Sequence, residues 1–282
     1  MHSTELEVFA EIHGIGSASG LFLKEKKLYI IGDNSANLNE FDLSNNQLHK
    51  INILFKNDLN ALDNIAKADK ADFEVLCNYR DRLFILGSGS AKNRNVMIDF
   101  DLQTKEIIER NLTHVYNKIK NKAKIDDDNF NIEGAIFTGK SWLLFNRGNG
   151  KHAKNGIFAI NGEDLTKSDN ATFLRINLPN VNHVESSFTD AVLYRNEIFF
   201  IATAEDTKST YNDGAILGSF VGSINLQTLE LNFATKISDV NKFEGICFFE
   251  KSKNKIEFLL CEDRDTEELK STIYRLTMNF QS

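Results

Sequence analysis

The chain has 282 residues, of which 41% are hydrophobic and only one is proline, so it is long enough for a large core and poor in disordered linkers. Its formal net charge of −7 argues against nucleic acid or an anionic membrane as the main partner. Since no run reaches about 18 apolar residues, we expect no membrane span. The N-terminus shows no signal sequence, so we expect a cytoplasmic protein unless a signal has been trimmed.

The first predicted element is a strand over residues 6–12, where apolar and polar residues alternate up to a glycine-rich turn. Five similar segments follow it. Each predicts an inner strand, a polar turn, a strongly apolar second strand, a polar loop and a third strand, and in the first four segments a more polar fourth strand follows. Apolar middle strands with a polar outer strand are typical of a radial four-stranded blade. The predicted blades cover residues 18–53, 73–112, 131–178, 188–237 and 243–280.

The fifth segment ends after its third strand, so its fourth strand is missing. Residues 6–12 are the obvious substitute, because joining both ends of the chain in one blade removes a free sheet edge. The sequence therefore predicts an all-β fold: a five-bladed β-propeller that forms a single domain over residues 1–282, expected as a monomer. A six-bladed ring is the alternative. It would need a blade hidden in residues 56–72 or 113–128, and both inserts are more typical of loops or single helices.

The inner strands open on related sequences, and one position recurs at intervals of 55, 59, 57 and 54 residues. Such a period indicates a repeat architecture. In an up-and-down blade, the entry to the first strand and the loop between the second and third strands lie at the same end. We therefore expect the recurring residues around one mouth of the central channel: Ser19, Glu74, Glu133, Asp190 and Glu244.

The loops between second and third strands should join these residues at the mouth and supply groups that bind a ligand. The candidates are Ser88, Asn146, Arg147, Asp263 and Arg264. We expect the inserts 56–72 and 113–128 at the same end, where Phe55, His114 and Tyr116 would provide ligand contacts.

Four carboxylates close to one axis repel one another, and three arrangements would relieve the repulsion. A hard cation, most readily calcium, would bind among Glu74, Glu133, Asp190 and Glu244, because calcium takes six to eight oxygen ligands. Alternatively, Arg94, Arg147 or Arg264 would neutralise the acids in an ion network. In the third arrangement the acids point apart and are solvated separately. The three cysteines lie in apolar runs without metal-type spacing and favour buried free thiols.

Three strands carry a resemblance to a known family: Phe-Glu-Val-Leu-Cys, Ile-Glu-Gly-Ala-Ile-Phe and Phe-Glu-Gly-Ile-Cys-Phe, with Leu-Phe-Asn-Arg-Gly-Asn after the second. They resemble an uncharacterised bacterial propeller family related to the phytase-like and SdiA-regulated groups. In those relatives the glutamate before glycine tends to face the channel, and calcium has been associated with such sites. The resemblance implies this role most for Glu133 and Glu244, less for Glu74, and least for Asp190. It implies no activity.

Two classes of function are consistent with these patterns. The first is a binding propeller that holds a small-molecule ligand, a divalent cation, or both at one mouth. The alternative is a metal-assisted hydrolase acting on a phosphoester, lactone or glycoside, in which a cation beside a spare carboxylate activates water. The sequence does not decide whether the protein is an enzyme.

Overall fold

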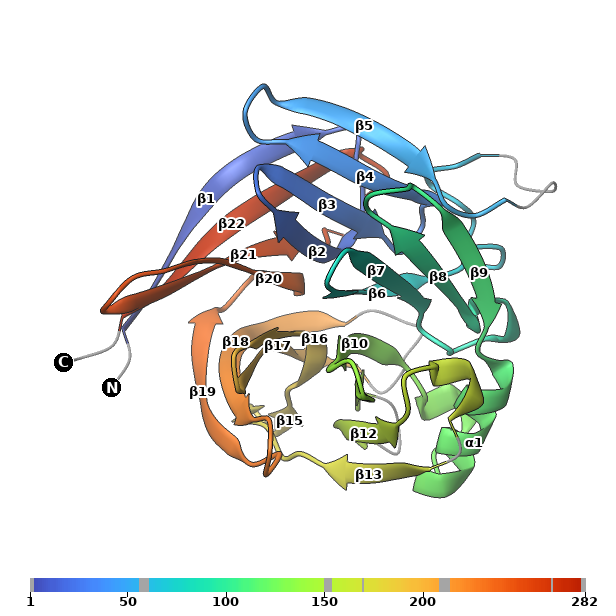
Figure 1. The fold of residues 1–282 in the computed structure, drawn as a ribbon. Coiled ribbons are helices and arrows are strands. Elements are labelled where there is room, and N and C mark those ends of the chain that lie inside the picture. The colour runs from blue at the N-terminus through green and yellow to red at the C-terminus, as the bar shows by residue number, and fades with distance from the viewer. Residues whose placement is uncertain are drawn as a thin grey trace.

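Five four-stranded antiparallel sheets stand around a common axis, each with one strand edge toward the centre (Figure 1). The computed structural model describes residues 3–55, 61–149, 154–168, 170–207, 214–264 and 266–279. The predicted five-bladed β-propeller is confirmed, and the described part of the two inserts holds no sixth blade. No helix in these ranges is long and apolar enough to cross a membrane.

Each blade follows the predicted order of strands from the axis outward. Blade 1 consists of β2 (Ala18–Lys24), β3 (Lys27–Gly32), β4 (Asn37–Asp42) and β5 (Gln47–Asn52). Blade 2 consists of β6 (Phe73–Tyr79), β7 (Arg82–Gly87), β8 (Val96–Asp101) and β9 (Ile107–Asn111). Blade 3 consists of β10 (Ile132–Phe137), β11 (Ser141–Asn146), β12 (Gly156–Asn161) and β13 (Ala171–Arg175).

Blade 4 consists of β16 (Ser187–Tyr194), β17 (Glu197–Asp206), β18 (Ala215–Asn225) and β19 (Leu231–Ser238). Blade 5 consists of β20 (Phe243–Lys251), β21 (Lys255–Glu262), β22 (Lys270–Asn279) and β1 (Ser3–His13). A two-stranded hairpin, β14 (Asn180–Val181) and β15 (Val184–Glu185), precedes blade 4. The helical elements are η1 (Lys92–Arg94), α1 (Thr113–Ala123), η2 (Asp127–Asn129) and η3 (Leu165–Lys167).

The second strand of each blade is nearly completely buried, because both of its faces pack against neighbouring blades. Aromatic rings make many of these contacts between blades. The rings of Phe84 and Trp142 meet edge to face with centroids 5.0 Å apart, and those of Phe199 and Phe258 lie 4.8 Å apart. Burial of each such side chain contributes roughly 1.5–3 kcal/mol to stability. The core is therefore distributed around the ring in the spaces between blades.

The N-terminal strand closes the ring as predicted. β1 pairs antiparallel with β22 from Ser3 opposite Asn279 to His13 opposite Lys270. In Figure 1 the two strands run together at the outer side of blade 5, with the N and C ends close to each other. Residues 6–12 are thus the missing fourth strand of the last blade.

A β-bulge lies at the entrance of every inner strand. In each blade the pairing with the second strand slips by one residue, so one residue of the inner strand is left without a partner. The bulged residues are Ser19, Glu74, Glu133, Thr189 and Glu244. Glycine often follows because the inner strands crowd the axis: a Cβ on Gly245 would lie 2.9 Å from the Cα of Gly20. The repeat predicted from the sequence is thus a repeat of bulges.

Candidate functional site

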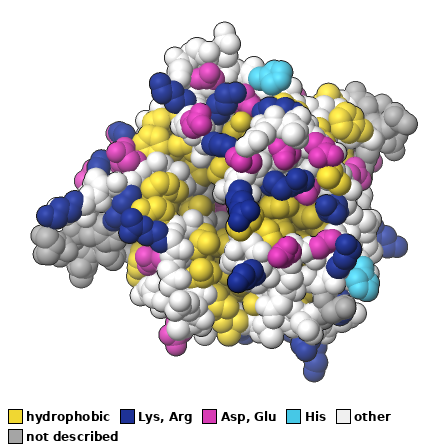
Figure 2. All heavy atoms as spheres, viewed as in Figure 1, with side chains coloured by type: hydrophobic (Ala, Val, Ile, Leu, Met, Phe, Trp, Pro, Cys, Tyr) yellow, Lys and Arg dark blue, Asp and Glu magenta, His cyan; other side chains and the backbone are white. Residues whose placement is uncertain are grey.

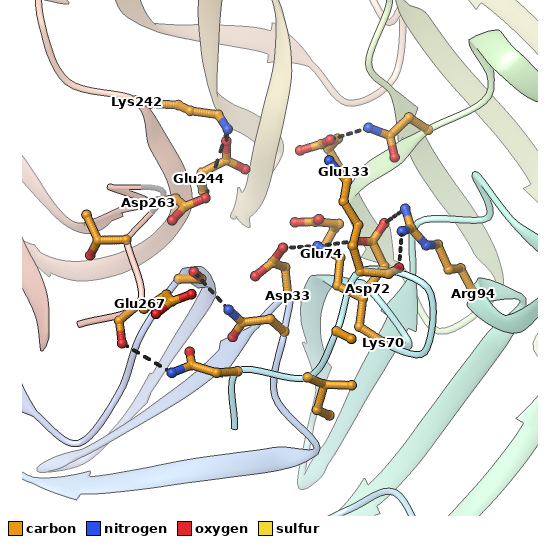
Figure 3. A pocket seen from close by; sticks show the side chains of 18 of the residues that line it. Asp33, Lys70, Asp72, Glu74, Arg94, Glu133, Lys242, Glu244, Asp263 and Glu267 are labelled. Carbon is orange, nitrogen blue, oxygen red and sulfur yellow. Dashed lines mark hydrogen bonds and ion pairs between the residues drawn. The ribbon is translucent and has the colours of Figure 1, made fainter. Parts of the chain in front are cut away.

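A cavity of about 440 Å³ opens at the end of the axis where the bulges lie (Figure 3). It is lined by bulged residues and by the residues two positions before them, because alternate residues of a strand face the same side. Blade 2 contributes Asp72 and Glu74, blade 3 contributes Asn131 and Glu133, and blade 5 contributes Lys242 and Glu244. The recurrent bulge therefore turns six polar side chains toward one space.

Three glutamates meet at this cavity, and we call Glu74, Glu133 and Glu244 the glutamate triad. Each offers one carboxylate oxygen, and the three oxygens lie within 4.8 Å of one another. The side chains of Glu133 and Glu244 are almost completely buried. At such separations in a poorly solvated site, three negative charges repel strongly.

Two cations compensate part of this charge. The Arg147 guanidinium lies 3.2 Å from Glu133 and 3.8 Å from Glu244, and it also donates to Glu205 of blade 4. The Lys242 ammonium lies 3.2 Å from Glu244. Arg147 is thus shared among three carboxylates.

The triad remains incompletely satisfied. Oε2 of Glu133 is buried and has no hydrogen-bond partner, and Glu74 has no cation within ion-pair distance among the described residues. Burial raises the pKa of Glu133 to about 8, against the opposing effect of Arg147. Burial and the neighbouring carboxylates also hold the pKa of Glu74 well above its usual range. The triad therefore favours uptake of a proton or of a cation.

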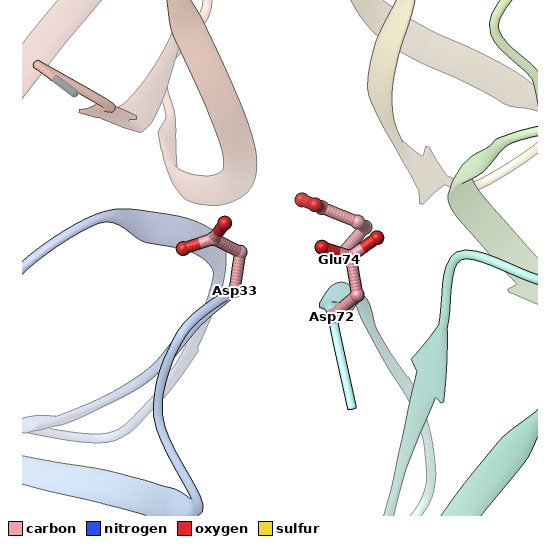
Figure 4. A group of neighbouring side chains, drawn as sticks. All are labelled: Asp33, Asp72 and Glu74. Carbon is pink, nitrogen blue, oxygen red and sulfur yellow. The ribbon is translucent and has the colours of Figure 1, made fainter. Parts of the chain in front are cut away.

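A second acidic group lies beside the triad and is better compensated. Asp33 of blade 1 faces Asp72 and Glu74 of blade 2 across the cavity (Figure 4). The Lys70 ammonium pairs with Asp33 and lies 2.7 Å from Asp72, and Arg94 donates to the other oxygen of Asp72 at 2.7 Å. This part of the mouth is an ion network, in which the two aspartates have two cations. The ion network, one of the arrangements that the sequence left open, is thus present in this part of the cavity.

Asp190 does not belong to the triad. One of its oxygens accepts from its neighbour's backbone, Ala191 N, at 2.7 Å, and the other accepts from Ile246 N of blade 5 at 2.8 Å. The prediction that it shares the position of Glu74, Glu133 and Glu244 is wrong by one residue, because the bulged residue of blade 4 is Thr189. The triplet Phe188-Thr189-Asp190 aligns with Phe243-Glu244-Gly245, so Asp190 occupies the glycine position.

Thr189 and Ser19 replace the acids in blades 4 and 1. The hydroxyl of Thr189 donates to the carbonyl oxygen of Phe243 at 2.6 Å, and that of Ser19 donates to the carbonyl oxygen of Phe73 at 2.5 Å. Each acceptor immediately precedes the bulged glutamate of the next blade. The hydroxyls therefore fix the backbone beside Glu244 and Glu74.

The predicted ligand-binding residues separate into three groups. Arg147 and Asp263 line the cavity. Asn146 is buried behind it, where its amide donates to Lys154 O at 3.1 Å, and Ser88 donates to the carboxylate of Asp72. The side chain of Arg264 is half exposed, 3.9 Å from Glu262, and does not line the cavity. Asn146 and Ser88 thus support residues of the mouth, and Arg264 lies apart from it.

One of the two inserts follows the expectation and the other does not. Residues 64–67 and Lys70 of the first insert line the cavity, as predicted. The helix α1 of the second insert packs instead against blade 3. Its Tyr116 is completely buried and donates to Gly87 O at 2.9 Å. Phe55 is 70% exposed, and neither it nor His114 is among the residues that line the cavity.

Several residues of the mouth were missed by sequence reasoning. Asp72, Asn131 and Lys242 each stand two positions before a bulged glutamate, and this spacing was readable in the sequence. Lys70 and Glu205 carried no comparable signal, because the residues of other blades with which they pair, Asp33 and Arg147, lie 37 and 58 residues away along the chain.

Comparison with solved structures shows the same fold in proteins of low sequence identity. Glutaminyl cyclase of Myxococcus xanthus is 9% identical over 97% of each chain, with a TM-score of 0.55. The PQQ-bound aldose sugar dehydrogenase of Streptomyces coelicolor is 8% identical over 98% of this chain and 99% of the enzyme, with a TM-score of 0.52. The tail fiber of Staphylococcus aureus phage P68 is 11% identical over 98% of this chain and 53% of the fiber, with a TM-score of 0.52.

These similarities concern the fold alone, and they do not support a specific relationship to the phytase-like or SdiA-regulated propellers. No curated protein sequence matches the chain. The profile of one protein family matches residues 14–278, which is nearly the whole chain. The chain therefore belongs to the family of unknown function DUF6929.

Proposed function

We propose that this protein is a binding propeller that holds a divalent cation, calcium in the first place, in the glutamate triad and a small ligand in the cavity above it. The observation that carries the proposal is Oε2 of Glu133, a buried oxygen that has no hydrogen-bond partner in the described part of the chain and lies beside the carboxylates of Glu74 and Glu244. A buried carboxylate oxygen left unpaired is costly, and a bound cation would satisfy it.

The donor chemistry points to a hard cation. The triad supplies three carboxylate oxygens within 4.8 Å of one another, and the adjacent Asn131 has a buried amide oxygen without a hydrogen-bond partner among the described residues. It holds no histidine or cysteine ligand. Oxygen-only sites suit calcium, magnesium and manganese better than zinc, and calcium tolerates irregular geometry best.

The space above the triad suits a small polar ligand. Its volume of about 440 Å³ lies within the range of small-molecule sites. Because Lys70, Arg94 and Arg147 are already paired with carboxylates, a ligand would gain most from the cation itself.

Calcium binding is tested by thermal melting of chelator-treated protein. A ligand that binds the native state alone stabilises it by about 2.7 kcal/mol at one hundred times its Kd, so calcium should raise the Tm of the wild type. Glu133→Gln should reduce this response, because it removes a ligand charge. Glu250→Gln, an exposed change on the same strand as Glu244, is the matched control and should respond like the wild type.

If ion pairs alone compensate the acids of the mouth, a different set of Tm values is expected. Calcium would then leave the Tm of the wild type unchanged at millimolar concentration. Glu133→Gln would lower stability regardless of calcium, because the buried Arg147 loses a partner. That combination would exclude the cation site.

A metal-assisted hydrolase is the second candidate. It is favoured by Glu74, which faces the solvent-open cavity and has no ion-pair partner among the described residues, so that in this alternative Glu133 and Glu244 would hold the cation and Glu74 would lie free beside it. Such a group can accept a proton from water bound to the cation. Calcium-dependent turnover of a phosphoester, lactone or glycoside that is lost in Glu74→Gln would favour this function over binding alone.

A further inference from the structure

The opposite end of the axis holds a second cavity of about 350 Å³. It is lined by the far ends of all five inner strands, whose entrances form the acidic mouth. Buried apolar side chains make its floor: Leu21, Leu76, Ile136, Ala191 and Ile246. On the face shown in Figure 2, hydrophobic side chains gather near the centre of the ring, with side chains of both charges around them.

Every blade contributes one aromatic ring to this cavity: Phe22, Tyr79, Phe137, Tyr194 and Phe248. The rings are fixed by contacts between neighbouring blades. Tyr194 stacks on Phe248 with centroids 4.4 Å apart, and Tyr79 meets Phe137 edge to face at 5.0 Å. The walls are therefore rigid and apolar, as in typical small-molecule sites.

A basic residue follows the tyrosine in two of the blades. The sequence Tyr-Arg recurs as Tyr79-Arg80 and Tyr194-Arg195, at the turn after each inner strand. The Arg80 guanidinium lies 5.1 Å from the ring centre of Tyr79, and that of Arg195 lies 5.4 Å from the ring centre of Tyr194. Arg80 itself lines the cavity.

These two arginines differ from the others in their partners. Within the described ranges, neither Arg80 nor Arg195 has a carboxylate within ion-pair distance. The other seven arginines each have one: Arg82, Arg94, Arg110, Arg147, Arg175, Arg264 and Arg275. Asp81, next to Arg80 in sequence, is engaged by Lys24 and by the amide of Gln103 at 2.7 Å. Arg80 therefore keeps its charge available at the rim of an apolar cavity.

We propose that this second mouth binds a small amphipathic organic acid, with its aliphatic or aromatic body in the ring-lined cavity and its carboxylate on Arg80. Apolar walls would bury the body, and the guanidinium matches the geometry of a carboxylate. The site is independent of the glutamate triad, since the two cavities share no residue.

The sole tryptophan gives a direct readout. Trp142 stacks on Phe137 with centroids 4.4 Å apart, and Phe137 lines the cavity. Titration of the full chain with sodium decanoate should change the tryptophan fluorescence in a saturable way. Decanol, which has the same body without the charge, should bind about tenfold more weakly. Calcium and chelator should leave both titrations unchanged.

Substitutions of Arg80 test the orientation of the ligand. Arg80→Gln should weaken decanoate about tenfold and leave decanol unchanged, and Arg80→Glu should favour decylamine over decanoate. Lys122→Glu, an exposed change on α1, reverses a charge outside the cavity and should bind decanoate like the wild type. Arg80 is exposed and makes no ion pair with the described residues, so its variants should fold. Equal affinity for decanoate and decanol, no effect of Arg80→Glu, or no saturable change would overturn the proposal.

Discussion

At the scale of single residues, the two oxygens of the Glu133 carboxylate in the acidic mouth differ in their surroundings. The backbone bulge turns Glu133 inward, Asn131 and Arg147 satisfy its Oε1, and its Oε2 stays buried without a partner. The folded protein therefore binds a proton at this site more tightly than the unfolded chain does. A cation and a proton would compete for the same oxygen.

This competition predicts how stability depends on pH in chelator-treated protein. The pKa of Glu133 rises from an ordinary value of 4.5 to about 8, so its proton stabilises the fold below about pH 4.5. That contribution is lost as the pH rises toward 8. The Tm of the chelator-treated protein should therefore fall as the pH rises through this window. The fall should be smaller in Glu133→Gln. The rise in Tm on addition of calcium should become larger at higher pH. Burial raises the pKa values of Glu40 and Asp63, but their partners, Lys27 and Lys50 among them, together lower these pKa values by more. These two carboxyl groups therefore titrate below this pH window and do not contribute to the expected fall in Tm. A flat Tm across the window would contradict the raised pKa.

Asp190 should behave as a structural residue. The Asp190 carboxylate accepts hydrogen bonds from two backbone N–H groups. In Asp190→Asn one of these N–H groups would face the amide nitrogen of the new side chain and lose its acceptor. We expect the free energy of unfolding to fall by about 1–3 kcal/mol, measured by urea denaturation. The rise in Tm with calcium should remain as large as in the wild type. Loss of the calcium response with unchanged stability would place Asp190 in the cation site after all.

At the scale of elements, the strand β1 closes the ring by completing the last blade. It covers β22 over its whole length, and Leu6, Phe9 and Ile12 pack into the clusters that join blade 5 to its neighbours. Without β1, the outer edge of β22 would be open to pairing with another chain.

Deletion of residues 1–12 tests this role. Loss of the buried side chains and of the strand pairing should lower stability by several kcal/mol, seen as a lower Tm and as aggregation in light scattering. Glu7→Gln is the control, because its ion pair with Arg275 is exposed and should change stability by less than about 1 kcal/mol. A truncated protein with the Tm and solubility of the full chain would show that β1 does not close the ring.

At the scale of the whole molecule, the sequence predicted what depends on local pattern and period. The order of strands, the five blades and the closure by residues 6–12 all follow from patterns within one segment or from its repetition. The mouth depends on contacts between blades, such as that of Arg147 with Glu205, 58 residues further along the chain. No local pattern records such a contact. Asp190 was misplaced because the sequence alone does not distinguish an acid at the bulge from an acid one residue after it. Only the register of the strand pairing shows that Asp190 follows the bulged residue.

The sequence also gave no indication of the second mouth. The tyrosines and phenylalanines that line it are typical of strand ends in any apolar core, and their convergence on the axis needs the ring geometry. The overall net charge gave no indication of this cavity either, because Arg80 is the one charged residue among the described residues that line it.

The pairing of β1 with β22 has a consequence for biosynthesis. Glu7 and Arg275 meet across 268 residues of chain. At about 5–20 residues per second, a ribosome needs roughly 13–54 s to make the segment between them. During that time blades 1 to 4 can fold in turn, while β1 has no partner strand. The nascent chain thus carries an unpaired strand with Leu6, Phe9 and Ile12, the kind of segment that chaperones bind, until the last blade leaves the ribosome.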